Sequence, residues 1–319
     1  MSDLLIALDF GGTKLSAGVA ARGETAWRGL KRAPSKPGAT AEDDLTLMTS
    51  LADELIKGDR PAAVGVSFGG PVDAPHGVVR LSDHVPGWED YPLQERLEQR
   101  YNVPASVDND ANVAALGEYV YGAGRGCHSL LYVTVSTGVG GGWILDGKVW
   151  RGFDGMAGEI GHTVIDPNGP MCFCGKRGCV ERLASGPYLA EYARELLDAE
   201  PAQGRLLRGQ VEDLEHLSAQ QVSAAAAAGD DLAWQALERA AWALGLGLGN
   251  AVNFVNPQRI VLGGGVTKSG ERYWDKVRSV ARVTARDQAT LDLVPAALGD
   301  DAPLWGAVAL AEAVLEGSA

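Results

Sequence analysis

Leu4-Leu-Ile-Ala-Leu-Asp-Phe-Gly-Gly-Thr-Lys14 is an apolar run of strand length that ends in an acid and two glycines. Leu15 to Ala20 resumes the apolar pattern, so the sequence predicts a strand, a glycine turn and a return strand. The pattern recurs from Leu130 to Val135, and aligning Gly11 with Gly138 superimposes two hairpins about 127 residues apart. Such a period is too long for a solenoid and favours a duplicated domain. Chance similarity between two glycine hairpins is the alternative.

Each half is expected to continue with helices and further strands. The expected helices cover residues 41–57, 93–101, 110–121, 187–199, 230–254, 272–285 and 305–316. The expected buried strands cover residues 62–68, 104–107 and 259–262. A glycine-rich stretch between residues 121 and 129 is the expected hinge. We therefore predict an N-terminal lobe of residues 1–121 and a C-terminal lobe of residues 122–304, with the last helix packing back on the first lobe.

The composition excludes several classes of protein. Of the 319 residues, 46% are hydrophobic and 22% are charged, as in globular proteins. The net charge of -13 argues against nucleic acid or an anionic membrane as a partner, because both attract clustered Lys and Arg. Asp3 and Asp9 flank the first apolar run, which is therefore no secretory leader, and glycines interrupt the longest one, residues 240–255. We expect a cytoplasmic protein.

Three glycine-rich turns follow predicted strands: Gly11-Gly12-Thr13, Gly138 to Gly142 and Gly263 to Gly265. Glycine at such a place lets backbone N–H groups converge on an anion. One turn can be an ordinary hairpin, but three, two of them in matching halves, indicate a nucleotide held between the lobes. The spacings of the dinucleotide-binding and Walker motifs are absent. Asp9, beside the first glycines, suits a hydrated Mg²⁺ carried by phosphates.

Four polar residues follow another predicted strand, in the order Asp108-Asn109-Asp110-Ala-Asn112. A helix N-cap explains one or two of them, since Asp and Asn are preferred caps. We interpret Asp110 as a general base and Asn109 as its hydrogen-bonding neighbour, in a cleft between the halves. The segment Gly69 to Asp73 also follows a strand, and it forms either a wall of that cleft or a plain turn.

Three of the four cysteines lie within eight residues, at Cys172, Cys174 and Cys179, about ten positions after His162. Three thiolates and an imidazole make a closed tetrahedral shell for a structural Zn²⁺. The alternatives are unrelated thiols or one disulfide that includes Cys127. Two carboxylates, Glu159 and Glu181, flank this loop, so a metal that fixes the loop also fixes them in space.

In order and spacing these motifs resemble the ROK family (repressors, open reading frames, kinases) in the actin-like ATPase superfamily, and most closely its bacterial ATP-dependent glucokinases. The resemblance runs nearly end to end, and the matching pieces are Asp9-x-Gly-Gly-Thr-Lys14, Gly70-Pro-Val-Asp73, Asn109-Asp-Ala-Asn112, Thr137-Gly-Val-Gly-Gly-Gly142, Gly158-Glu-Ile-Gly-His162, Cys172-x-Cys-Gly-x-x-Gly-Cys-x-Glu181 and Leu262-Gly-Gly-Gly-Val266. It departs from the family at His84, where many relatives place Asn at one edge of the sugar pocket.

The resemblance implies a duplicated actin-like (ribonuclease H-like) α/β ATPase fold with two lobes and an active-site cleft between them. It implies a kinase that transfers the γ-phosphate of ATP to the 6-hydroxyl of glucose, using Mg²⁺, a structural Zn²⁺ and Asp110 as catalytic base, in a homodimer or homotetramer. The sugar contacts implied are Gly70, Asn109, Asp110, Glu159, His162 and Glu181. The ATP contacts implied are Asp9, Gly11, Gly12, Thr13, Lys14, Thr137, Gly138, Gly140, Gly264 and Gly265. The zinc ligands implied are His162, Cys172, Cys174 and Cys179.

Two alternatives stay open. Carboxylates that bind hydroxyls do not reveal stereochemistry, so N-acetylmannosamine, mannose, fructose or allose are rival substrates. The family also contains sugar-responsive repressors, which carry a helix-turn-helix segment ahead of the first phosphate loop. Because that loop begins at Asp9 and the chain is acidic, we expect a kinase.

Overall fold

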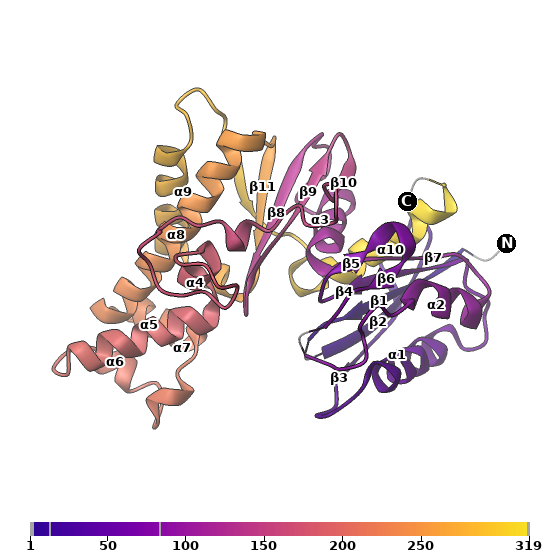
Figure 1. Cartoon of the computed structure of the whole chain (residues 1–319), viewed down its shortest axis with the longest axis horizontal. Coiled ribbons are helices and arrows are strands. Elements are labelled where there is room, and N and C mark those ends of the chain that lie inside the picture. The colour runs from indigo at the N-terminus through magenta and orange to yellow at the C-terminus, as the bar shows by residue number, and fades with distance from the viewer. Residues whose placement is uncertain (1–2, 13, 83, 318–319) are drawn as a thin grey trace. The chain divides into compact units, whose positions relative to one another are not determined.

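The structure of the chain, a computed structural model, describes residues 3–12, 14–82 and 84–317 (Figure 1). It divides into two compact units. The first unit comprises residues 1–132, 142–157 and 296–319, and the second comprises residues 133–141 and 158–295. These boundaries separate groups of residues that contact one another. The expected boundary at residue 121 instead separates two copies of a duplicated domain, so the two lobes stay a prediction.

The first sheet has five strands in the order β3-β2-β1-β4-β7. Their bounds are β1 (Leu4–Phe10), β2 (Lys14–Ala21), β3 (Trp27–Pro34), β4 (Ala63–Phe68) and β7 (Ala105–Asn109). Strand β1 runs antiparallel to β2 and parallel to β4, which in turn runs parallel to β7. The register pairs Asp9 with Ser67, and Ser67 with Asp108. Three polar side chains therefore lie side by side where the parallel strands end. A small hairpin, β5 (Val72–Asp73) and β6 (Val78–Val79), stands apart.

Both faces of the first sheet are covered by helices. The helices are α1 (Ala41–Ile56), α2 (Leu93–Tyr101), α3 (Asp110–Val120) and α10 (Ala302–Leu315). Ile6 and Leu8 of β1 belong to one buried cluster with residues of α1 and α2. Leu5 and Ala7 belong to another cluster with residues of α3 and α10. Because successive strand residues face opposite sides, a sheet covered on both faces requires an uninterrupted apolar run, which β1 has from Leu4 to Leu8.

Helix α10 approaches the sheet and α3 through glycines. A Cβ at Gly306 would lie 1.7 Å from the Val113 carbonyl oxygen, and one at Gly65 would lie 1.8 Å from the Ala307 carbonyl oxygen. Only glycine allows backbones to come this close. The helix begins at Ala302, ahead of the expected residue 305, and its small residues serve this contact.

The second sheet repeats the strand order of the first, as β10-β9-β8-β11-β12. Its strands are β8 (Leu130–Val135), β9 (Val139–Leu145), β10 (Lys148–Trp150), β11 (Arg259–Gly263) and β12 (Leu293–Pro295). In both sheets the strand before the glycine turn is central, the return strand lies beside it, and a later strand flanks its other side. The duplicated α/β fold predicted from the two hairpins is thereby confirmed.

The helices of the second unit are α4 (Val180–Ala184), α5 (Gly186–Ala199), α6 (Arg205–Arg208), α7 (Ala219–Ala227), α8 (Asp231–Val255) and α9 (Glu271–Thr284). Short 3₁₀ turns are η1 (Ala74–His76), η2 (Ile160–His162), η3 (Leu214–His216), η4 (Gly265–Lys268) and η5 (Gly299–Asp301). The long α8 packs against α9 through small residues, and a Cβ at Gly249 would lie 2.4 Å from Thr284 Cβ. Among the helices of the described residues, α8 included, none combines the length and apolar character needed to cross a membrane.

Candidate active site

Polar groups of the first unit gather at the edge where β1, β4 and β7 end. The Ser67 hydroxyl donates a hydrogen bond of 2.8 Å to Asp9 Oδ1. The backbone N–H of Gly69 donates to the Phe10 carbonyl oxygen at 2.9 Å, which holds the two strand ends together. In sheets of this kind the carboxyl ends of parallel strands are where ligands bind. The predicted site residue Asp9 therefore stands at such an edge.

The pKa of the Asp9 carboxyl is shifted toward neutral pH. Burial raises the pKa of Asp9 to about 7, the hydrogen bond from Ser67 opposes that rise, and the nearby Asp110 carboxylate adds to it. A bound cation would favour the ionised form again, because an opposite charge nearby lowers the pKa of an acid. Oxygen atoms of carboxylates are ligands that Mg²⁺ takes, so this corner has the right chemistry for that ion.

The first glycine turn is held by its own backbone. The Gly11 N–H donates to the Lys14 carbonyl oxygen at 3.2 Å, and Lys14 then begins β2 with an exposed side chain. His84 lies against this turn, since a Cβ at Gly12 would fall 2.5 Å from His84 Cδ2. The sequence departure at His84 thus lies beside the predicted phosphate loop. Thr13, also predicted to contact ATP, lies outside the described residues.

Asn109 and Asp110 stand at the junction of β7 and α3. Asn109 is the N-cap of α3, where its Oδ1 accepts a hydrogen bond of 3.0 Å from the Ala111 N–H. Its Nδ2 donates to the Gly70 carbonyl oxygen at 3.0 Å, which brings two predicted sugar-contact residues together. Asp110 is the first residue of α3, and its Oδ1 accepts from the Ala111 N–H at 2.8 Å. The capping alternative is therefore right for Asn109, and it fixes the backbone that carries Asp110.

A basic residue that the sequence did not single out joins this junction. Arg151, just after β10, donates from Nε to Asp108 Oδ2 at 2.7 Å. The sequence contains one indirect sign that Asp108 has a basic partner: Asp108 lies at the end of a buried strand, and a buried carboxylate needs a cation or several hydrogen-bond donors. That signal does not identify which of the 28 Lys and Arg residues supplies the charge.

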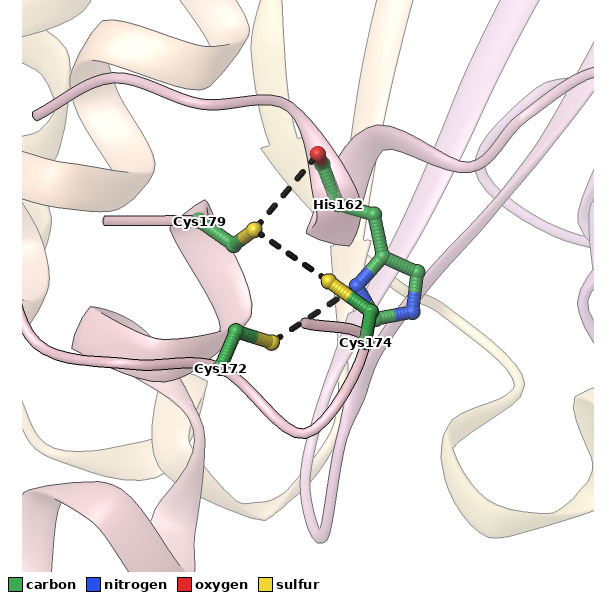
Figure 2. Close-up of side chains that lie close together, drawn as sticks. All are labelled: His162, Cys172, Cys174 and Cys179. Carbon is green, nitrogen blue, oxygen red and sulfur yellow. Dashed lines mark hydrogen bonds between the residues drawn. The ribbon is translucent and has the colours of Figure 1, made fainter. Parts of the chain in front are cut away.

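In the second unit the four predicted zinc ligands converge (Figure 2). Their ligand atoms all lie within 4.8 Å of one another. Cys174 Sγ and Cys179 Sγ are 3.6 Å apart, and Cys172 Sγ is 3.9 Å from His162 Nδ1. In a tetrahedral zinc site with Zn–S near 2.3 Å, neighbouring sulfurs stand about 3.8 Å apart. The donor set therefore fits a structural Zn²⁺.

The thiols are present as free cysteines, Cys127 among them, so the disulfide alternative does not apply to this structure. Burial raises the pKa of Cys179 to about 12, and a metal that binds this thiol must displace its proton. The loop needs Gly178, whose φ of 63° is left-handed and whose Cβ would lie 1.7 Å from the Asp166 carbonyl oxygen.

His162 presents its two ring nitrogens to different neighbours. Nδ1 faces Cys172, as Figure 2 shows, whereas Nε2 lies 3.9 Å from Glu159 Oε2. The ring of Phe173 meets the imidazole edge-on, with centroids 5.3 Å apart. One nitrogen can therefore bind a metal while the other is directed to a half-exposed carboxylate. This arrangement allows the metal and sugar roles predicted for His162 to coexist.

Glu181 is a buried carboxylate with one oxygen in use. Its Oε2 accepts from the Val139 N–H at 2.8 Å, and the side chain is 7% exposed. Its Oε1 is buried and has no hydrogen-bond partner among the described residues. Buried polar atoms are almost always paired, so this oxygen is a candidate acceptor for a ligand hydroxyl. Gly138 is close by, since a Cβ there would lie 2.7 Å from Glu181 Oε2.

The second unit also contains a cavity of about 980 Å³. It is lined by Ser136, Thr137, Gly186, Pro187, Ala190, Arg194, Leu217, Ser218, Ala219, Gln220, Ser223, Ala224, Ala227, Gly265, Val266, Lys268, Ser269 and Gly270. Of the predicted ATP contacts, Thr137 and Gly265 line this cavity, whereas Gly138, Gly140 and Gly264 are not among its lining residues. Gly264 has a φ of 90°, and a Cβ there would lie 2.3 Å from the Val135 carbonyl oxygen. The helices α5 and α7 that complete the cavity carry no recognisable motif, so the sequence did not reveal them.

Comparison with known proteins matches residues 5–314 to the ROK family. A glucokinase of Thermotoga maritima is 31% identical over 308 residues, which are 96% of this chain and 96% of that protein. The crystal structure of a ROK family glucokinase from Streptomyces griseus in complex with glucose and AMPPNP superposes with a TM-score of 0.83 at 34% identity, covering 97% of this chain and 99% of that one. The xylose repressor of Bacillus subtilis is 32% identical over 250 residues, which are 73% of this chain and 61% of the repressor.

Proposed function

The chain belongs to the ROK family, and we propose that it is an ATP-dependent glucokinase, which transfers the γ-phosphate of ATP to the 6-hydroxyl of glucose. The observation that carries this proposal is the nearly end-to-end match to an enzyme whose crystal structure holds glucose and an ATP analogue. The repressor matches over a smaller share of its own length, and no residue of the site favours that function over catalysis.

Asp110 acts as the general base. Its place as the first residue of α3, on a turn fixed by Asn109, supports this role because the carboxylate is held in one position. It accepts the proton of the 6-hydroxyl as that oxygen attacks the γ-phosphorus in line. A positioned base contributes about 10²–10⁴-fold to a rate, and the rest of the acceleration in phosphoryl transfer comes from positioning and electrostatics.

Asp9, Gly11, Gly12, Thr13 and Lys14 hold the phosphate end of Mg-ATP. Asp9 would hold Mg²⁺ here, and the ion would supply positive charge that offsets the negative charge developing during transfer. Burial raises the pKa of the Asp9 carboxyl to about 7, and once ionised this carboxylate would be a suitable oxygen ligand for the ion or hydrogen-bond acceptor for its water. The exposed Lys14 adds a positive charge beside the phosphates.

The nucleoside end of ATP occupies the cavity of the second unit. Its volume of about 980 Å³ is at the upper end of the usual range for ligand pockets, about 300–1,000 Å³. Thr137 and Gly265 lead from the glycine turns into this cavity. Gly138, Gly140 and Gly264 expose backbone N–H groups to the phosphates, as glycine turns do at anion sites.

Glucose hydroxyls bind to Glu181, Glu159 and His162, together with Asn109 and Gly70. The unpaired Oε1 of Glu181 and the directed Nε2 of His162 support these roles. A structural Zn²⁺ bound by His162 and the three neighbouring cysteines holds the loop in place. We also propose that the enzyme works in the cytoplasm as a homodimer or homotetramer.

A panel of hexoses in a coupled ADP-release assay tests the proposal. Initial rates are compared at matched, sub-saturating concentrations of glucose, mannose, fructose, allose and N-acetylmannosamine. We expect kcat/KM to be about tenfold or more higher for glucose than for N-acetylmannosamine. The bulky 2-amide of N-acetylmannosamine would leave a buried polar group of the site unpaired, at a cost of about 1–3 kcal/mol. Equal or faster phosphorylation of N-acetylmannosamine would overturn the substrate, and no sugar-dependent ADP release would point to a regulator.

A further inference from the structure

We propose that Arg151 and Asp108 form a positioning pair that holds the catalytic turn of the kinase in its productive geometry. The inference rests on the proposed function only in taking Asp110 as the base. Neither Arg151 nor Asp108 touches the reacting atoms in this account. They act through the backbone of Asn109 and through Asn112.

The Asp108 carboxylate is fully used by donors from this turn. Its Oδ2 accepts from Arg151 Nε at 2.7 Å, and its Oδ1 accepts from the Asn109 N–H at 2.7 Å and from Asn112 Nδ2 at 3.2 Å. Its side chain is 3% exposed. With both oxygens engaged, Asp108 is unavailable as a general base. It instead links one cation to the residue directly before Asp110 and to the first turn of α3.

The cation comes from a distant part of the chain. Arg151 follows β10, begins the loop of residues 151–157, and accepts from the Ala157 N–H at 3.1 Å through its own carbonyl oxygen. That loop leads along the chain to Glu159, a predicted sugar contact. One ion pair therefore fixes two chain segments that precede functional residues.

Burial makes this pair sensitive to the loss of one partner. A buried carboxylate without its cation is strongly unfavourable, whereas removing both charges together is much better tolerated. When Arg151 is replaced alone, Asp108 must move or recruit water, and the Asn109 backbone moves with it. Displacement of a reacting group by about 1 Å can lower a rate by about 10²-fold, so a partial displacement predicts a loss of about tenfold in kcat.

A matched ion pair provides the control. Arg259, at the start of β11, donates from Nε to Asp292 Oδ2 at 2.7 Å, and its side chain is 31% exposed against 30% for Arg151. The two arginines thus make the same bond with the same atom and similar exposure. Only Arg151 bonds to a residue beside the catalytic turn.

The experiment measures kcat and both KM values for the wild type, R151Q, R151K, the double variant D108N/R151Q, and R259Q. We expect R151Q to lose about tenfold in kcat with KM for sugar and ATP within about twofold, and R151K to recover to within about threefold of the wild type. R259Q should stay within about twofold. Rates are measured with whichever hexose the wild type phosphorylates fastest. If glucose is not that sugar, the wild type alone shows that the proposed substrate is wrong, and the ratios of kcat between variants still test the ion pair.

If R151Q does not fold, the charge-free double variant replaces it; a smaller loss of kcat, still more than about twofold, is expected because the ionic bond is gone although no buried charge is left unpaired. A folded variant lacking the pair that keeps kcat within twofold of the wild type would overturn the proposal. So would a loss that appears in KM alone, or an equal loss of kcat in R259Q. Failure of both R151Q and the double variant to fold would also overturn it, since the pair would then be an anchor of the fold.

Discussion

The glycine turns at residues 9–14 and 136–141 occupy equivalent places in two sheets of the same strand order, yet they carry different chemistry. The first turn carries two charged side chains, the acidic Asp9 and the basic Lys14. At the corresponding positions the second has Ser136 and Gly141, and it borders a cavity of about 980 Å³. The two copies share the same backbone arrangement, but only the first turn has charged side chains at these two positions. On the proposed function, the first copy supplies the charged side chains at the reacting phosphate, whereas the second supplies backbone N–H groups to the phosphates and borders the cavity for the nucleoside.

The largest expected effect comes from the base beside the first turn. Asp110→Asn should lower turnover by at least about 10²-fold, with sugar and ATP affinity within a few-fold, because only the proton acceptor is lost. Steady-state kinetics and equilibrium sugar binding measure the two quantities. Asp90→Asn is the control, since Asp90 is exposed and its φ of 49° suits Asn. Near-normal turnover of Asp110→Asn would place the chemistry elsewhere, whereas loss of sugar binding would make Asp110 chiefly a ligand.

The second expected effect concerns the proposed zinc site, whose four ligand residues all lie in the second unit. The purified protein should contain about one zinc per chain, and Cys174→Ser should lose it, because a closed three-cysteine, one-histidine site needs every ligand. Glucose KM should rise by about tenfold or more as Glu181 and His162 lose their support. Elemental analysis and kinetics check both outcomes. Cys127→Ser should retain the metal, and active enzyme without zinc would refute the idea.

A third prediction compares one glycine from each turn. Gly138→Ala places a methyl group 2.7 Å from the buried Glu181 Oε2, whereas Gly12→Ala places one against the exposed ring of His84. The buried carboxylate is held by the Val139 N–H and has little room to move, so we expect glucose KM to rise about fivefold in Gly138→Ala, the scale of one weakened hydrogen bond. Gly12→Ala should change it by less than about twofold. The reverse order in steady-state KM would contradict the assignment of Glu181 to the sugar.

The smallest expected effect is a pH dependence of stability from Asp9. Because burial raises the pKa of Asp9 from 3.8 to about 7, the folded state binds more protons than the unfolded state between these values. Its contribution to stability is therefore full below about pH 4 and is lost as pH rises to about 7. Urea unfolding in Mg²⁺-free buffer should show the wild type losing stability relative to Asp9→Asn as the pH rises across this window, because Asn cannot ionise. A difference that is constant with pH would remove Asp9 as its source.

The sequence predicted the parts of this molecule whose chemistry is local along the chain. The glycine turns, the Asn109-Asp110 junction and the cysteine loop are each contained in a few residues, so residue type and spacing were enough. The structure gathers the four predicted zinc ligands as expected. The spacing of apolar residues also predicted long helices such as α8, whose observed ends differ by one residue from the expected residues 230–254.

Contacts between distant segments could not be read in this way. Arg151 reaches Asp108 across 43 positions of the chain. Glu118, fully buried in α3, accepts hydrogen bonds from the backbone N–H groups of Ala123, Ala297 and Leu298, the last two being 179 and 180 residues away. No local pattern marks such partners, because an acid on a helix can accept hydrogen bonds from many different donors. The walls of the cavity escaped prediction for the same reason.

The close seating of α10 has a consequence for biosynthesis. Leu5 and Ala7 of the first strand are covered by residues that include Leu304 and Val308, so this face of the first sheet stays open until the last helix leaves the ribosome. At about 5–20 residues per second, the roughly 190 residues between α3 and the end of α10 take about 10–40 s to translate. During that interval the nascent chain exposes an apolar sheet face. Premature stop codons after α3, including those that remove only α10, should therefore leave the same apolar face of the first sheet exposed and prone to aggregation.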